Sequence, residues 1–151
     1  MKAIIQRVSG AEVKVDGELI SKISEGFLVL LGVHNTDTTK EAKLLASKTA
    51  NLRIFTDNED KMNRSVLDID GEILVISNFT LCANTKKGNR PSFIEAMEPK
   101  TADELYNLYC EELKENGVKK VGKGIFGADM KVSLLNDGPV TIILDTDTWR
   151  K

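Results

Sequence analysis

The sequence predicts an α+β fold in which a curved, mainly antiparallel β-sheet is covered by two helices. Apolar and polar residues alternate with a period of two near both ends of the chain, as in half-buried strands. Between these regions, two capping boxes each precede a segment with apolar residues at helical spacing. The 151 residues are 41% hydrophobic and 29% charged, which is typical of one ordinary globular domain. We therefore assign residues 1–151 to a single domain.

The first third of the chain is predicted to form a meander of about four strands. Residues 11–15 alternate between apolar and polar side chains, and turns are expected at residues 16–17 and 25–26. The segment 18–24 is then a return strand. The nearly unbroken apolar run 27–33 suits a strand that is buried on both faces.

Two helices are predicted from their first turns. Thr38 and Glu41 form a capping box, so the first helix is expected over about residues 38–51. After Pro99, a second capping box at residues 101–104 predicts a helix that ends at residues 116–117. The apolar face expected for this helix consists of Leu105, Leu108, Tyr109 and Leu113.

The remaining segments are predicted to be a polar connection and three more strands. Residues 52–72 are mostly polar and indicate loops with a short strand. Residues 73–76 indicate a buried strand. The chain closes with two strands, over about 130–134 and 140–144, joined by a turn at residues 136–139.

The charge of the chain argues against a protein whose whole surface binds nucleic acid. Lys and Arg number 21 and Asp and Glu 23, giving a net charge of −2, whereas phosphate binding depends on clustered cations. Local basic patches remain candidates, although such runs are more often solvated faces. The candidates are Lys86-Lys87 with Arg90, Lys119-Lys120 with Lys123, and Arg150-Lys151.

The protein is expected to be cytoplasmic and not to associate with a membrane. The longest apolar stretch, residues 27–33, is far shorter than the roughly 20 residues that span a bilayer. Near the N-terminus, Gln6 and Arg7 interrupt the apolar run before the core of a signal peptide could form.

The sequence offers few side chains for metal binding or acid-base catalysis. Cys82 and Cys110 lack the spacing of a zinc site, and His34 is the only histidine. A lone histidine at a strand end is more often a surface or loop residue than a catalytic base. No carboxylate lies on an apolar background that would raise its pKa. We expect neither a metal nor another cofactor.

Two segments stand out as candidate sites. Residues 77–81, Ser-Asn-Phe-Thr-Leu, leave the buried strand with two hydroxyls and an aromatic ring. Residues 136–141, Asn-Asp-Gly-Pro-Val-Thr, contain a Gly-Pro step between two strands. Taken alone, the first is a strand end whose hydroxyls cap a turn, and the second is a hairpin turn.

Together these segments resemble motifs of the D-aminoacyl-tRNA deacylase family. The first is similar to that family's Ser-Gln-Phe-Thr-Leu motif, with Asn78 in place of Gln, and the second matches its Asn-x-Gly-Pro-Val-Thr motif. Four further segments resemble family segments in family order, so the resemblance covers essentially the whole chain. They are residues 5–8, 61–63, 90–93 and 126–130.

The resemblance implies an enzyme that hydrolyses the ester between a D-amino acid, or glycine, and the 3′-terminal adenosine of tRNA, with rejection of L-aminoacyl substrates. It implies a barrel-like sheet, and a homodimer with sites at the subunit interface. The catalytic segment would be Ser77, Asn78, Phe79 and Thr80. Gly138 and Pro139 would bind substrate as a cis step inserted into the partner's pocket, and Arg7 would fix that step. Phe126 and Met130 would contribute to the adenosine pocket.

Other functions stay open on the sequence. A tRNA- or nucleotide-binding module would keep an adenosine pocket without hydrolysis, and a related editing deacylase would act on a mischarged L-amino acid. The expected partners are aminoacyl-tRNA and a second copy of the chain, with no DNA.

Overall fold

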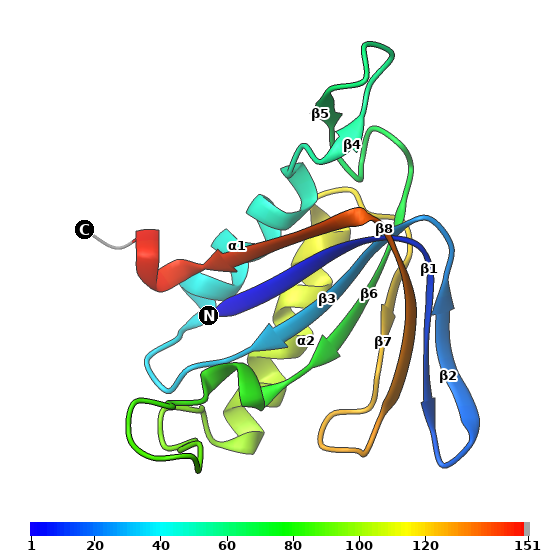
Figure 1. The fold of residues 1–151 in the computed structure, drawn as a ribbon. Helices are drawn as coiled ribbons and strands as arrows, with labels where there is room; N and C mark the ends of the chain where they lie inside the picture. The colour runs from blue at the N-terminus through cyan, green and yellow to red at the C-terminus, as the bar shows by residue number, and fades with distance from the viewer. Residues whose placement is uncertain (150–151) are drawn as a thin grey trace.

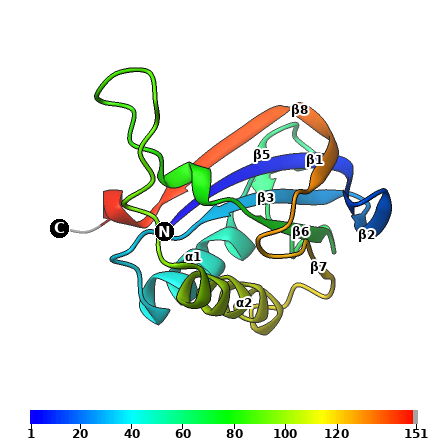
Figure 2. The same cartoon turned by 90° about the horizontal axis from the view of Figure 1, so that it is seen from below.

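The computed structural model describes residues 1–149, so the basic pair Arg150-Lys151 lies outside the described residues. A mixed, strongly curved sheet lies over two helices (Figures 1 and 2). In chain order the elements are β1 (Lys2–Val15), β2 (Glu18–Ile23), β3 (Gly26–Gly32), α1 (Thr39–Asn51), β4 (Phe55–Thr56), β5 (Met62–Arg64), β6 (Glu72–Ser77), the 3₁₀ helix η1 (Phe79–Cys82), α2 (Pro99–Glu115), β7 (Val121–Lys123), β8 (Lys131–Asp145) and the 3₁₀ helix η2 (Thr146–Trp149). Within residues 1–149, neither α-helix is long and apolar enough to cross a membrane.

The N-terminal meander has three strands rather than the four predicted, because β1 is one continuous strand. Its first half, residues 2–8, pairs with β3, and residues 11–15 pair with β2. Along its other edge, β1 pairs with β8 over almost its whole length. The β1–β8 register shifts on both sides of Val8, and such irregularities bend a strand and increase its twist. β1 therefore curves from one part of the sheet into the next.

The closing segment is also one strand, and the predicted hairpin turn at residues 136–139 is wrong. Both halves of β8 run antiparallel to β1, so the chain does not reverse direction. Gln6 pairs with Thr141 and Val8 pairs with Asn136, so residues 137–140 lie opposite the single residue Arg7. The Gly-Pro step belongs to a wide bulge in a long strand.

The sheet is mixed. All strands paired with β1 are antiparallel to it, as predicted, but β3, β6 and β7 run parallel to one another. Parallel neighbours need a long crossover, which α1 and α2 provide. Consequently the carboxyl ends of β3 and β6 lie at the same edge of the sheet, where functional groups commonly gather in such arrangements.

The run 27–33 is buried on both faces, as predicted. Phe27 and Val29 face the core shared with the helices, whereas Leu28 packs in a second core with Val8 and Val13 of β1. The curled ends of the sheet enclose this second core, so the sheet is barrel-like and nearly closed, which confirms the predicted fold class (Figure 1).

The two helices begin with different caps. At α1 the predicted capping box is confirmed, because Thr38 Oγ1 accepts from the N–H of Lys40 at 3.3 Å and Glu41 Oε2 accepts from the N–H of Thr38 at 2.8 Å. At α2 the predicted box at residues 101–104 is wrong. The carboxylate of Glu98 instead accepts from the N–H groups of Lys100 and Thr101, so the cap lies three residues earlier than predicted and the helix begins at Pro99.

The buried face of α2 also differs from the prediction. Tyr106 is buried and Leu108 is only half-buried, so the apolar stripe is rotated from the predicted one. Tyr109 is buried as expected, and its hydroxyl hydrogen-bonds to Thr49 Oγ1 at 2.9 Å. This bond joins the two helices at their contact.

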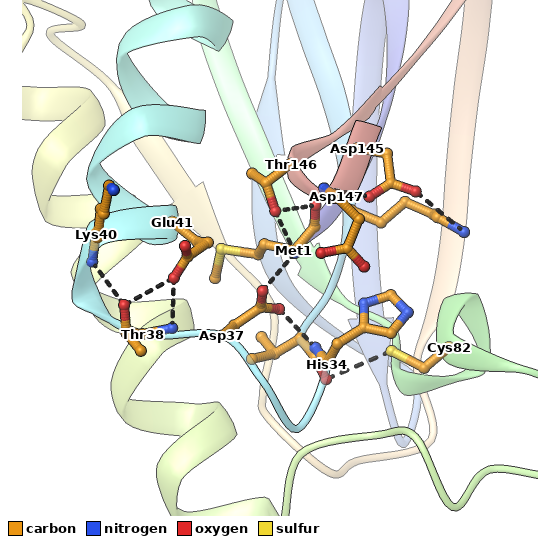
Figure 3. Close-up of polar contacts among 12 residues, drawn as sticks. Met1, His34, Asp37, Thr38, Lys40, Glu41, Cys82, Asp145, Thr146 and Asp147 are labelled. Atoms are coloured by element: carbon orange, nitrogen blue, oxygen red, sulfur yellow. Dashed lines mark hydrogen bonds and ion pairs between the residues drawn. The ribbon is translucent and has the colours of Figure 1, made fainter. Parts of the chain in front are cut away.

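A buried ion pair joins the first residue to two distant segments (Figure 3). The Met1 ammonium donates to Asp37 Oδ1 at 2.6 Å and to Thr146 Oγ1 at 2.7 Å. Asp37 Oδ2 also accepts from the N–H of His34 at 2.7 Å. The side chains of Met1 and Asp37 are fully buried. The pair therefore links β1, the loop before α1 and the end of β8.

Candidate active site

A cavity of about 720 Å³ opens at the carboxyl ends of β3 and β6. Leu31 of β3 and Ile76 of β6 form part of its wall, and the first turn of α2 and the loop after β7 close the sides. Most of the lining side chains are apolar or aromatic. A cavity of this size and character is typical of a small-molecule or nucleoside site.

The structure brings most of the predicted catalytic segment to this cavity. Ser77, Asn78 and Phe79 line it, and Thr80 follows on the exposed surface of η1. The N–H of Asn78 donates to the carbonyl oxygen of Leu31 at 2.8 Å, so the segment is fixed to the end of β3. The Thr80 hydroxyl donates a hydrogen bond to Asn78 Oδ1. The shorter side chain found where the family has Gln is therefore engaged with Thr80.

The predicted adenosine-pocket residues lie in the same cavity. Phe126 and Met130 line the wall formed by the loop between β7 and β8. The ring of Phe126 packs against Tyr106 of α2, with ring centroids 6.1 Å apart. At the mouth, Phe79 is 60% exposed and makes an edge contact with Phe93 at 5.1 Å. These four rings offer flat apolar surfaces of the kind on which a base can stack.

Two ionisable side chains that line the cavity, Tyr106 and Glu98, have pKa values shifted away from neutrality. Burial raises the pKa of Tyr106 well above its usual range, and its hydroxyl donates to the carbonyl oxygen of Val75 at 2.7 Å. Hydrogen bonds from Thr101 lower the pKa of Glu98, so this carboxylate is ionised and occupied in capping α2. A general base near neutral pH needs a pKa close to 7.

His34 and the two thiols do not supply such a base. His34 lies after β3, where its N–H donates to Asp37, and it does not line the cavity. Burial raises the pKa of Cys82 to about 11 and that of Cys110 to about 12. Among residues 1–149, no three His, Cys, Asp or Glu side chains converge as a metal site would require.

The Gly138-Pro139 step lies outside the cavity, in the bulge of β8. Gly138 and Pro139 are exposed, the peptide between them is cis, and neither lines the cavity. Arg7 contacts this segment as predicted, because its Nε donates to the carbonyl oxygen of Asp137 at 2.9 Å. Arg7 Nη1 also donates to the carbonyl oxygen of Ile54 at 2.8 Å, which anchors the bulge to the body of the protein.

Position 138 accepts only glycine without rearrangement. Its φ is +147°, and a Cβ there would lie 2.7 Å from both the backbone nitrogen and Cγ2 of Val140. The Asn136 side chain stabilises the same bulge, since its Oδ1 accepts from the N–H of Val140 at 2.9 Å. A Gly138→Ala variant therefore disturbs its own bulge, in addition to any effect on a substrate.

A family model described as D-Tyr-tRNA(Tyr) deacylase matches residues 4–145, nearly the whole chain. The chain belongs to this family. Similar proteins include a D-aminoacyl-tRNA deacylase of Roseiflexus castenholzii, 56% identical over 151 residues that cover 100% of this chain and 96% of the relative. The D-aminoacyl-tRNA deacylase of Flavobacterium psychrophilum is 54% identical over 146 residues, covering 97% of each chain.

Two solved structures share the fold. One, described as c-Myc DNA Unwinding Element Binding Protein, has a TM-score of 0.90 at 45% identity and covers 96% of this chain and 98% of its own. The other, described as a probable eukaryotic D-amino acid tRNA deacylase, has a TM-score of 0.81 at 16% identity, with coverages of 95% and 97%. The predicted membership of the deacylases, which are ester hydrolases, is thereby confirmed, and a binding module without hydrolysis is not favoured.

Several residues that line the cavity are not predicted from the sequence. Tyr106 contributes from α2, Phe93 from the loop after η1, and Glu98 from the cap of α2. Phe93 lies in a segment that resembles the family, but nothing in that segment assigns it a role. The signal for Tyr106 is its helical spacing from Ala102 and Tyr109, which places it on the buried face once the helix start is known.

Proposed function

We propose that this chain hydrolyses the ester of D-aminoacyl-tRNA, and of glycyl-tRNA mischarged on tRNA-Ala, releasing the amino acid and tRNA. The observation that carries the proposal is an aromatic cavity lined at one end by Ser77, Asn78 and Phe79, with the neighbouring Thr80 hydroxyl bonded to an amide oxygen rather than to a base. An adenosine fits the apolar, ring-lined part of such a cavity. The ester on its ribose would then lie against the catalytic segment at the mouth.

The chemistry proposed for this site depends on the substrate and on the backbone. A ribose 2′-hydroxyl lies next to the 3′ ester and can position the attacking water. Water adds to the ester carbonyl, the bond to the 3′ oxygen breaks, and that oxygen leaves with a proton. N–H groups in the first turn of a helix have no partner within it, so those of Phe79 and Thr80 can stabilise the oxyanion. One such donor is worth roughly 2.7–4 kcal/mol.

Chiral selection is proposed to come from a second copy of the chain. Gly138 and Pro139 are exposed and lie outside the cavity of their own chain, so they are available to complete the cavity of a partner. A D-amino acid or glycine would fit beside this main chain, whereas an L side chain would collide with it. Exclusion of this kind gives specificity by repulsion.

The apolar outer surface of β8 supports the homodimer. Leu135 is 67% exposed and Ile143 is 66% exposed, and they lie on either side of the Gly-Pro bulge. β8 pairs with β1 along one edge. Exposed apolar residues on a long edge strand are unfavourable in a monomer and mark surfaces that other chains cover.

One assay tests the proposed activity. Purified protein is incubated with D-tyrosyl-tRNA, L-tyrosyl-tRNA and glycyl-tRNA-Ala, with and without EDTA, and the released amino acid is measured. We expect hydrolysis of the D-tyrosyl and glycyl esters, no hydrolysis of the L-tyrosyl ester, and no effect of EDTA. Binding of all three without release would indicate a binding module. Preferential release of L-tyrosine would indicate an L-specific editing enzyme, and zinc-dependent activity would contradict the metal-free chemistry.

We also propose that the protein acts in the cytoplasm and on tRNA rather than on DNA. Aminoacyl-tRNA is a cytoplasmic substrate, and the net charge of −2 offers no general attraction for duplex DNA. A tenfold excess of duplex DNA should leave hydrolysis of D-tyrosyl-tRNA unchanged. Strong competition by the duplex would contradict this part of the proposal.

A further inference from the structure

Three cations lie in one exposed loop near the cavity, residues 84–92, which we call the basic loop. It contains Lys86, Lys87 and Arg90, all exposed. No Asp or Glu occurs between Glu72 and Glu95, although the chain as a whole is net negative. The loop projects from the body of the protein beside η1 in both views (Figures 1 and 2).

The base of the basic loop is fixed by hydrogen bonds. The N–H of Asn84 donates to the carbonyl of Ser92 at 2.8 Å, and the N–H of Ser92 donates to the carbonyl of Asn84 at 2.9 Å. Asn84 Oδ1 also accepts from the N–H of Lys86 at 3.0 Å. Gly88, at the tip, is four residues from either end of this bridge and so lies within about 14 Å of it. The cations are therefore held close to the base.

That base adjoins the mouth of the cavity. Phe93 follows Ser92 directly and packs edge-on against Phe79, and both rings line the cavity. The surface thus continues from two apolar rings in edge contact to the loop that carries three cations. Proteins that bind single-stranded nucleic acid combine these same two features, rings for the bases and cations for the backbone.

We propose that the basic loop binds the phosphates of the single-stranded 3′ end of tRNA, immediately before the terminal adenosine. This inference rests on the proposed function, because it takes the adenosine to occupy the cavity. A strand leaving the cavity at Phe79 and Phe93 carries one negative charge per nucleotide past Lys86, Lys87 and Arg90. The charge complementarity favours RNA over a second copy of this net-negative chain.

The test compares a triple variant, Lys86→Gln, Lys87→Gln and Arg90→Gln, with a matched control. The control removes three cations at the opposite end of the sheet, Lys114→Gln, Lys119→Gln and Lys120→Gln, which pair with Glu111, Asp70 and Glu72. A second control, Lys86→Arg, Lys87→Arg and Arg90→Lys, keeps the charge of the loop. Circular dichroism and light scattering verify that all variants keep the fold and oligomeric state of the wild type.

Each protein is assayed on D-tyrosyl-tRNA and on D-tyrosyl-adenosine, which has no phosphate. For the triple variant we expect KM for the tRNA to rise about tenfold or more at 0.1 M salt, with kcat unchanged. The slope of log(kcat/KM) against log salt should become shallower by about 2, since each single-strand phosphate contact contributes about 0.7. The adenosine ester should be hydrolysed equally by the triple variant and the wild type, and both controls should behave like the wild type on the tRNA.

Several outcomes overturn the inference. An unchanged KM and salt slope for tRNA would show that the loop does not bind phosphate, and equal losses on both substrates would show that it acts on the cavity itself. Dissociation of the triple variant into monomers would make the loop a subunit contact. Fluorescence anisotropy with uncharged tRNA gives an independent readout: if the wild type hydrolyses neither ester, the proposed function fails, but a weaker affinity of the triple variant still identifies the loop as the phosphate site.

Discussion

The hydroxyl of Thr80 donates a hydrogen bond to the side-chain oxygen of Asn78, which is an amide and cannot take up the proton. A threonine becomes a nucleophile only when a neighbouring group can take that proton. The ionisable side chains that line the cavity, among them Glu98 and Tyr106, are occupied in other hydrogen bonds. At the scale of single residues, the geometry favours a positioning role for Thr80 in the proposed hydrolysis.

Replacing Thr80 by Ala should therefore lower turnover only modestly. One hydrogen bond is worth about 1 kcal/mol, so kcat on D-tyrosyl-tRNA should fall by roughly tenfold or less. Thr80→Ser, which keeps the hydroxyl, should stay near the wild-type rate. A loss beyond about 10⁴-fold in the alanine variant, or an acyl group trapped on Thr80 and detected by mass spectrometry, would instead indicate covalent catalysis.

The two cysteines should be inert in the folded protein. Burial raises the pKa of Cys82 to about 11 and that of Cys110 to about 12, so both remain thiols at pH 8. Because the thiolate is the reactive form, neither should react with Ellman's reagent within minutes, and both should react once the protein is unfolded in urea. Rapid reaction of one equivalent under native conditions would show that a cysteine is more accessible than the structure indicates.

Helix starts can be predicted from the sequence where they depend on hydrogen bonds between residues close together in the chain. The capping box at Thr38 gave the correct start of α1, because the hydrogen bonds that make the cap lie within four residues. The start of α2 was missed, because Glu98 is an uncommon cap and Thr101 offered a more familiar pattern. The continuous β1 and β8 could not be predicted, since their length depends on pairing between segments more than 100 residues apart.

The candidate site likewise contains residues that the sequence predicts and residues that only the structure shows. The motifs at residues 77–80 and 126–130 are recognised by their resemblance to the family, and the structure brings residues 77–79 and 126–130 to one cavity, which Thr80 does not line. Gly138 and Pro139 are also predicted as site residues, but in a hairpin turn. In the structure they form a bulge opposite Arg7. Phe93 reaches the cavity through tertiary packing, for which its own segment carries no local signal, whereas Tyr106 follows from helical spacing once the start of α2 is known.

Glu72, the first residue of β6, makes stability depend on pH. Its Oε1 accepts from the N–H of Ser24 at 2.7 Å, and its Oε2 pairs with Lys120 at 3.2 Å. The hydrogen bond from Ser24 is the main cause that lowers the pKa of Glu72. A carboxylate with a lowered folded pKa contributes stability above its unfolded pKa, near 4.3, and loses it as the pH falls through the folded value.

Glu72→Gln should therefore be less stable than the wild type at pH 7, and the difference should shrink below about pH 4, where Glu72 of the wild type becomes protonated. Urea unfolding at a series of pH values measures this. The matched control is Glu59→Gln on the β4–β5 hairpin, whose partner is the exposed Lys61 at 3.8 Å, and its effect at pH 7 should be smaller. A difference between Glu72→Gln and the wild type that stays constant from pH 7 to pH 3 would contradict the assignment.

The buried pair between the Met1 ammonium and Asp37 holds together β1, the loop before α1 and the end of β8. Asp37→Asn leaves the ammonium buried without its counter-charge, so the free energy of unfolding should fall by about 3–5 kcal/mol. The pair of Lys2 and Asp145, 3.8 Å apart and with both side chains partly exposed, provides the control, and Asp145→Asn should cost less than about 1 kcal/mol. Equal effects of the two substitutions in urea unfolding would show that burial of the Met1–Asp37 pair adds nothing.

The proposed dimer makes the site a property of two chains, because the cavity and the Gly138-Pro139 step lie apart in one chain. The wild type should scatter light as a particle of twice 16.7 kDa at micromolar concentration. Replacing both Leu135 and Ile143 by Asp places charges on the apolar surface of β8, which would have to be desolvated in the interface. This double variant should be a folded monomer that has lost hydrolysis of D-tyrosyl-tRNA.

Leu44→Asp provides the matched control, since Leu44 is 45% exposed and belongs to α1, a helix drawn on the opposite side of the sheet from β8 in Figure 2. This variant should remain dimeric and active, because its charge meets only solvent. A double variant that stays dimeric would place the interface elsewhere. If it is monomeric yet still hydrolyses D-tyrosyl-tRNA and spares L-tyrosyl-tRNA, one chain suffices for chiral selection, and Gly138-Pro139 of a partner cannot be the group that excludes the L side chain.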